Sequence, residues 1–254
     1  MKLILLITAL TITCFAIGQT RVAPTAINKT QLRTTVQKCF RIMDSIRFKD
    51  PDKLEVENKK LIQLLAKHKE ELFKWMNEQD FDFLYIAKST DNKLCLISWD
   101  TRMGGTMIDF ASIALYQATG QSVKYTLLKG GEGLSNDENT LMHYDTVHTV
   151  ITGKGNVYLA HGFGQGSTAY PWQEVRAFRI EDNQLKMPAV FPEKESRLFV
   201  AFDTHQFGDD ELIPTIKVRS QGKTILYPIA TESEGFSGKY QTFILSGSRY
   251  VEKK

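Results

Sequence analysis

Apolar residues recur every three or four positions early in the chain, and this spacing places them on one face of a helix. The pattern predicts a helix over residues 28–48. Asn28 and Gln31 stand three positions apart at its start, which is typical of a capping box. The apolar face consists of Leu32, Val36, Phe40, Met43 and Ile46. We therefore expect one side of this helix to pack against another part of the protein.

A second amphipathic helix is predicted over residues 51–77. Asp50 is a favourable capping residue, and Pro51 suits the first helical position. Its apolar face consists of Leu54, Leu61, Leu65, His68, Leu72, Trp75 and Met76. His68 is interpreted as a core or interface residue because it lies on this face. Only a short turn separates the two helices, so we expect an antiparallel pair.

From Phe81 onward the apolar residues alternate with polar ones, as in β-strands. Short turn-rich connections favour antiparallel pairing, because parallel strands need long crossovers. Further strands are expected at 94–100, 106–117, 122–128, 141–152, 156–163, 173–180, 197–203, 213–219, 223–229 and 239–246. The prediction is an α+β fold with two N-terminal amphipathic helices packed on a mainly antiparallel β-sheet, sandwich or irregular barrel.

A β-propeller is the alternative architecture, because Trp99 and Asp100 end one predicted strand as in a propeller blade. Such blades need about 40–45 residues each, and the motif occurs once. We therefore favour a single domain. It comprises a helical N-terminal segment, residues 19–80, and an antiparallel β-rich body, residues 81–254.

The chain begins with a pattern typical of a secretory signal peptide, residues 1–18. Lys2 supplies a positive charge, an apolar run follows, and Ala16 and Gly18 provide small residues for cleavage. The run is short for a membrane span, which takes about 20 residues. We therefore expect cleavage after Gly18 and no transmembrane helix in the mature chain.

Two alternatives to a signal peptide are a buried N-terminal helix and a lipoprotein acylated at Cys14. The apolar run lacks the polar face of a surface helix, and no small residue directly precedes Cys14. Cleavage leaves Gln19 at the new N-terminus. A start of this type resembles uncharacterised exported proteins of the Bacteroidota, and the resemblance covers the signal region alone. It implies a periplasmic or extracellular location.

Composition and charge narrow the function only slightly. The 254 residues are 42% hydrophobic and 24% charged, which is typical of a folded protein and excludes a disulfide-stapled miniprotein. The formal net charge of +3 gives no support for nucleic-acid binding. Cys39 and Cys95 remain after cleavage. An oxidising compartment permits them to pair, and two buried free thiols are the alternative.

The segment 98–106 gathers polar residues and glycines at the end of a predicted strand. Trp99 and Arg102 are predicted ligand contacts, since an indole stacks on rings and a guanidinium binds carboxylates or sugars. Asp100 is a candidate catalytic acid or base. The alternative is that Asp100 and Arg102 form an ion pair and that the glycines form a turn or bulge.

A glycine-rich loop is predicted over residues 161–172. Tyr170 and Trp172 are interpreted as ligand-stacking residues above a cleft, with His161 at its base as a second catalytic candidate. The glycines do not complete a phosphate-binding loop, because serine occupies the third glycine position and a proline follows. The alternatives are a core histidine at 161 and an ordinary hairpin loop.

His143 and Asp145 are predicted on one strand face, a spacing that suits a metal site or a His–Asp pair. Asp145 is the third catalytic candidate. A metal site would need a further ligand from elsewhere, such as His161 or His205, and no zinc-binding motif is present. We therefore favour a solvated strand face and expect no metal and no cofactor.

No motif specific to an enzyme class occurs in the sequence. A glycosidase needs two facing carboxylates, for which Asp100, Asp109, Asp145 and Glu174 are candidates. We expect a non-catalytic exported binding module for a glycan, a peptide or an envelope protein. The alternative is a cell-envelope or extracellular hydrolase acting on glycans or peptides. That alternative requires the polar candidates to meet in one pocket beside the predicted aromatic contacts.

Overall fold

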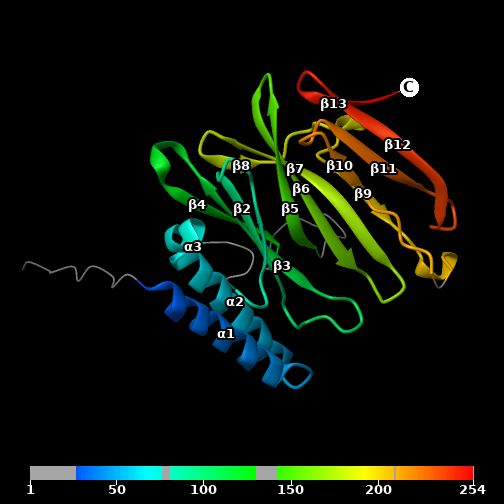
Figure 1. The fold of residues 1–254 in the computed structure, drawn as a ribbon. Helices are drawn as coiled ribbons and strands as arrows, with labels where there is room; N and C mark the ends of the chain where they lie inside the picture. The colour runs from blue at the N-terminus through cyan, green and yellow to red at the C-terminus, as the bar shows by residue number, and fades with distance from the viewer. Residues whose placement is uncertain (1–26, 76–80, 130–141, 209, 254) are drawn as a thin grey trace, which may run out of the picture.

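The computed structural model describes residues 27–75, 81–129, 142–208 and 210–253. It shows an α+β fold with antiparallel sheets, which confirms the predicted fold class (Figure 1). The predicted signal peptide, residues 1–18, lies outside the described residues. Among the helices that the structure describes, none is long and apolar enough to cross a membrane.

The helical part comprises α1, α2 and α3. Their bounds are Lys29–Ile46, Pro51–Lys67 and Lys69–Trp75. At the start of α1, the Asn28 side chain accepts the backbone N–H of Gln31 at 2.9 Å, and the Gln31 side chain accepts the N–H of Asn28 at 3.2 Å. The helix expected over residues 51–77 is interrupted at His68, whose φ of −107° and ψ of 28° are not helical.

Three antiparallel sheets form the β-rich body. The first runs in the order β1 (Tyr85–Lys88), β2 (Leu94–Asp100), β3 (Phe110–Gln117) and β4 (Val123–Lys129). The second contains β5 (His143–Thr152), β6 (Gly155–Gln165), β7 (Pro171–Glu181) and β8 (Gln184–Lys186), with β9 (Arg197–Ala201) also pairing with β7. The third contains β10 (Lys217–Arg219), β11 (Thr224–Ala230), β12 (Phe236–Ser246) and β13 (Arg249–Glu252).

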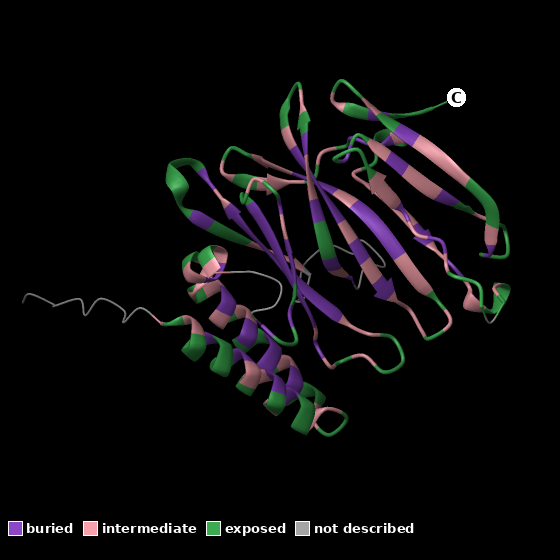
Figure 2. Ribbon diagram, viewed as in Figure 1, coloured by how far each residue is buried: buried purple, intermediate pink, exposed green. Residues whose placement is uncertain are grey.

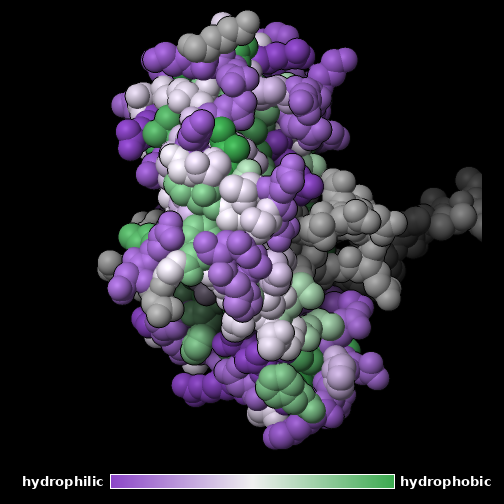
Figure 3. Space-filling view, turned by 90° about the vertical axis from the view of Figure 1, so that its right-hand side faces the viewer, coloured by the Kyte–Doolittle hydropathy of each residue, from purple (hydrophilic) through white to green (hydrophobic). Residues whose placement is uncertain are grey.

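The sheets are stacked, and Figure 2 shows where their residues are buried. Each interface has its own apolar core. One core contains Phe40 and Leu61 of the helices together with Ile97 of the first sheet. A second core joins the other face of the first sheet to the second sheet. A third joins the second sheet to the third. The second sheet is therefore covered on both faces. The side of the molecule shown in Figure 3 is mainly hydrophilic, with small hydrophobic areas.

The predicted loop 161–172 is largely strand. β6 continues to Gln165 and β7 begins at Pro171, so the connection is short. The glycines here make room for aromatic rings. A Cβ on Gly162 would lie 3.0 Å from the ring of Tyr144, and one on Gly166 would lie 2.5 Å from Cζ3 of Trp172. Glycine in β6 and in the turn that follows it therefore allows close packing.

Candidate functional site

A groove lies beside strand ends of the first sheet and extends to the place where this sheet meets the second. It consists of two hollows of about 290 Å³ each, and both are lined by Tyr85, Ile108 and Phe110. We call the two hollows together the inter-sheet groove. Its apolar half is also lined by His143, Phe163, Trp172 and Ile213, and its polar half by Phe83, Asp100 and Arg102.

Closely spaced rings from both sheets line the apolar half. The ring centroid of His143 lies 4.1 Å from that of Tyr85, 5.0 Å from that of Phe110 and 6.1 Å from that of Phe163. Strand register explains part of this arrangement, because His143 is the cross-strand partner of Phe163. Tyr85 remains 42% exposed, so this half of the groove presents aromatic surface to solvent.

Two buried ring nitrogens beside this half have no hydrogen-bond partner among the described residues. They are Nδ1 of His143 and Nε1 of Trp172. Buried polar atoms are usually satisfied, so these two mark a place where the protein's own hydrogen bonding is incomplete. Burial also lowers the pKa of His143, and the charge of Asp145 partly opposes that shift. Burial therefore favours the neutral form of the His143 imidazole.

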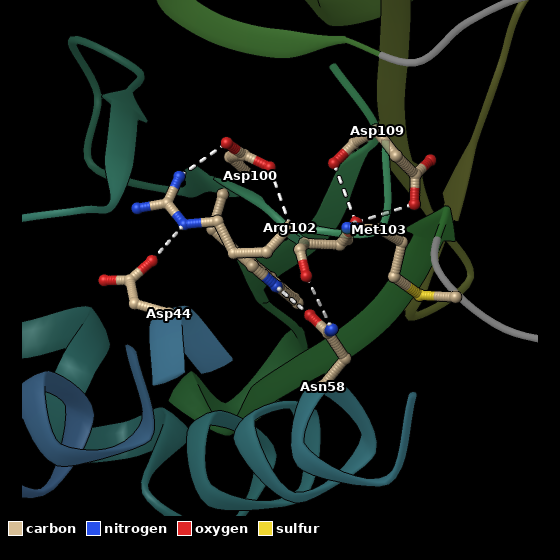
Figure 4. Close-up of polar contacts among 8 residues, drawn as sticks. Asp44, Asn58, Asp100, Arg102, Met103 and Asp109 are labelled. Carbon is tan, nitrogen blue, oxygen red and sulfur yellow. Dashed lines mark hydrogen bonds and ion pairs between the residues drawn. The ribbon is translucent and has the colours of Figure 1, made fainter. Parts of the chain in front are cut away.

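The polar half of the groove is organised around Arg102 (Figure 4). Its Nη1 donates to Oδ2 of Asp100 at 2.5 Å, and its Nε donates to Oδ1 of Asp44 at 2.8 Å. Its backbone N–H donates to the other oxygen of Asp100 at 2.7 Å. Arg102 adopts a positive φ of 65°, a backbone conformation that residues other than glycine rarely adopt. Both oxygens of Asp100 are thus engaged by Arg102, as the ion-pair alternative requires.

The structure places Trp99 in the apolar core. Its side chain is 0% exposed, and its Nε1 donates to Oδ1 of Asn58 in α2 at 3.0 Å. The Asn58 amide in turn donates to the carbonyl oxygen of Thr101 at 2.9 Å. Trp99 therefore connects β2 to the helices, and it offers no surface to a ligand in this structure.

Two of the catalytic candidates, His161 and Asp145, do not line either hollow of the groove. The ring of His161 packs against that of Phe163 at 4.6 Å, and burial lowers the pKa of His161 to about 4. Asp145 is exposed at a β-bulge where the β5–β6 register shifts between Tyr144 and Thr146. Asp145 still interacts electrostatically with His143, because each charge partly opposes the effect of burial on the pKa of the other group.

The two remaining aromatic candidates separate. Trp172 lines the apolar half of the groove. Tyr170 is 41% exposed in the turn before β7, and its hydroxyl lies 3.5 Å from Oδ2 of Asp203. Tyr170 does not line either hollow. Asp100, Arg102 and His161 therefore do not meet in one pocket enclosed by Tyr170 and Trp172.

Sequence reasoning did not identify most of the residues that line the groove. Tyr85 and Phe110 fall in expected strands with no role assigned to them, and His143 is a candidate for a metal site or a His–Asp pair. Aromatic residues at strand ends are a signal that a search for grooves can use. Their convergence depends on how the two sheets meet, and local alternation carries no such information.

The other candidate carboxylates have structural partners. Glu174 is fully buried, accepting from the hydroxyl of Tyr144 at 2.8 Å and from Nε of Arg176 at 2.7 Å. Asp109 accepts from the hydroxyl of Thr101 at 2.7 Å. Within the described part of the chain, no group of three His, Cys, Asp or Glu residues is placed to hold a metal ion.

Cys39 of α1 and Cys95 of β2 are not joined by a disulfide in the structure. Cys95 is buried in the core between the helices and the first sheet, and Cys39 packs against the same core. Burial raises the pKa of Cys95 to about 12 and also raises that of Cys39. Neither sulfur therefore has the thiolate character of a reactive cysteine.

No protein-family model, no curated protein and no solved structure matches the chain. The inter-sheet groove has the clearest features of a ligand site, because it combines apolar rings with a small number of polar groups.

Proposed function

We propose that the chain is a non-catalytic binding protein, exported to the periplasm or the extracellular space, whose ligand inserts an apolar or aromatic group into the inter-sheet groove. The observation that carries the proposal is the set of rings around His143, at centroid distances of 4.1 to 6.1 Å. Aromatic side chains supply large contact areas at low entropic cost. A glycan, a peptide or an envelope protein presents suitable rings or apolar side chains.

Export is supported by the N-terminal pattern and by the resemblance of that region to exported proteins of the Bacteroidota. The same proposal includes the finer architecture, in which N-terminal amphipathic helices cover a sandwich of antiparallel sheets. Its support is the core cluster shared by the helices and the first sheet. This arrangement holds Asp44 of α1 against Arg102 at the polar half of the groove.

A binding role is favoured over a hydrolase because the candidate acids and bases are either held by hydrogen bonds to other side chains or do not line the same groove. Asp100 is held by Arg102, and Glu174 is held by Tyr144 and Arg176. A general acid or base must reach the proton that it transfers. His161 does not line the groove that Asp100 lines, so these two groups do not act on one ligand bound there.

The test is a retention screen of the purified chain on immobilised peptidoglycan, polysaccharides and aromatic peptides, with chromogenic esters and glycosides as turnover substrates. We expect retention without turnover, and at least a tenfold loss of affinity in Trp172→Ala. Tyr125→Ala is the matched control, because Tyr125 is a 46% exposed aromatic residue of β4 that does not line the groove. Turnover that Asp100→Asn abolishes would contradict the proposal, as would equal retention by the two alanine variants.

A further inference from the structure

A separate hollow of about 350 Å³ opens where β7 leaves β6. The ladder between these strands begins at the Tyr158–Phe178 pair, and the following residues of β7 pair with β8 instead. The turn between β1 and β2, which carries Lys93, forms another side of the hollow. The residues that line the hollow include Lys93, Lys154, Asn156, Tyr158, Arg179 and Glu181.

The lining of this hollow is strongly basic. Lys93, Lys154 and Arg179 contribute three positive charges from three different elements, and no carboxylate of the described residues lies within ion-pair distance of them. The one acidic lining residue, Glu181, is already paired with Lys186 at 3.1 Å. Like charges that converge on a concavity raise the local concentration of anions.

Arg179 adds a second, independent observation. Its Nε is buried and has no hydrogen-bond partner among the described residues. A buried donor of a charged group without an acceptor is costly. Within the described part of the chain no acceptor therefore neutralises Arg179 at Nε, and its charge is available to an anion in the hollow.

The base of the hollow is rigid, because Asp91 organises it through four hydrogen bonds. Asp91 accepts from the Ser89 hydroxyl at 2.7 Å and from the Lys93 backbone N–H at 3.1 Å. It also accepts from the Asn156 amide at 3.0 Å and the Tyr158 hydroxyl at 2.9 Å. The carboxylate is thus saturated with donors from both sheets, and it fixes the turn that carries Lys93 against β6.

We propose that this hollow binds an oxyanion, namely a phosphate or sulfate group carried by a small organic body. Lys93 and Lys154 supply mobile ammonium groups and Arg179 supplies a guanidinium, the side chains that bind such groups best. A volume of about 350 Å³ lies at the lower end of the range for ligand pockets. The hollow therefore has room for a group the size of a sugar in addition to the anion.

The experiment is isothermal titration calorimetry of the full chain with glucose 6-phosphate, glucose 6-sulfate, inorganic phosphate and uncharged glucose. We expect binding of the charged probes and none of glucose, with affinity that falls as salt is raised. The two sugar esters distinguish a phosphate site from a sulfate site. Lys93→Ala and Lys154→Ala each weaken binding about tenfold, since a hydrogen bond to a charged group is lost.

Lys239→Ala is the matched control, because Lys239 is an exposed lysine of β12 in the third sheet. Lys93 and Lys154 are exposed, so their variants are expected to fold. Trp172→Ala is expected to keep the anion affinity, which separates this site from the inter-sheet groove. The proposal is overturned if no charged probe binds. It is also overturned if a variant that combines Lys93→Ala with Lys154→Ala binds the charged probes as tightly as Lys239→Ala does.

Discussion

The indole of Trp99 and the amide of Asn58 form a buried hydrogen bond of 3.0 Å between β2 and α2. The Asn58 side chain completes its hydrogen bonding with the carbonyl oxygens of Leu54 and Thr101, at 3.0 and 2.9 Å. One polar side chain thus satisfies two groups of the first sheet that would otherwise be buried without partners. Thr101 directly precedes Arg102, so the same contact positions the polar half of the inter-sheet groove.

Replacing Asn58 with alanine is expected to lower the free energy of unfolding by about 2–4 kcal/mol, because the Trp99 N–H and the Thr101 carbonyl lose their partner. Urea unfolding monitored by circular dichroism measures the change. Gln63→Ala is the control, since Gln63 is an exposed amide residue of the same helix. Equal stability of the two variants would show that the Asn58 contacts are not stabilising.

The sequence predicted the class of the fold because period and turn chemistry are local. Alternation from Phe81 onward indicated antiparallel strands, and the Asp100–Arg102 pair was one of the two readings that the spacing allowed. The third member, Asp44, lies 58 positions from Arg102 in α1. Such a non-local partner leaves no trace in the spacing of the residues.

The glycine segment shows a different limit. Gly162 lies in β6 and Gly166 directly follows its last residue, Gln165. Glycine has no side chain to display alternation, so the segment resembles a loop in the sequence. The rings of Tyr144 and Trp172 fill the space that the missing side chains leave. The role of these glycines therefore depends on which aromatic rings pack against them. That packing is non-local, so the sequence pattern around the glycines does not reveal it.

The Glu174→Gln variant tests whether the buried carboxylate of Glu174 stabilises the fold. Glu174→Gln keeps the shape and removes the charge that compensates Arg176, so we expect a loss of about 3–5 kcal/mol in the free energy of unfolding. Glu181→Gln on the same strand is the control. Its exposed pair with Lys186 contributes less than about 1 kcal/mol. A Glu174→Gln variant as stable as the unmodified chain would indicate that the carboxylate does not stabilise the fold.

The stability of the protein is expected to fall between about pH 6.5 and pH 4. Burial lowers the pKa of His161 to about 4 in the folded chain, whereas an unfolded histidine has a pKa of about 6.5. The unfolded state therefore binds a proton first as the pH falls, and folding loses up to about 3 kcal/mol across this window. Urea unfolding at pH 7 and pH 4.5 measures the loss.

His161→Gln removes this titration and is expected to reduce the loss. Burial lowers the pKa of His143 and His148 as well, so part of the pH dependence remains. His205→Gln is the matched control, because the His205 side chain is 74% exposed. An unchanged difference between the two pH values in His161→Gln would exclude His161 as its source.

Gly166 controls the position of Trp172 and hence the apolar half of the inter-sheet groove. In Gly166→Ala, the new Cβ would lie 2.5 Å from Cζ3 of Trp172, which is closer than atoms pack, so the indole must move. We expect a loss of about 1–3 kcal/mol in stability from this overpacking and weaker ligand retention. The indole N–H resonance of Trp172 in a proton–nitrogen NMR spectrum reports the displacement.

Gly153→Ala is the control for the same chemical change. A Cβ on Gly153 meets no atom within 4 Å, so the Trp172 resonance and the ligand affinity should stay as they are in the unmodified chain. If Gly166→Ala shifts the resonance and retention is unchanged, Trp172 is a packing residue and the ligand does not contact it. If both respond together and Gly153→Ala leaves both unchanged, the groove and the binding surface are the same.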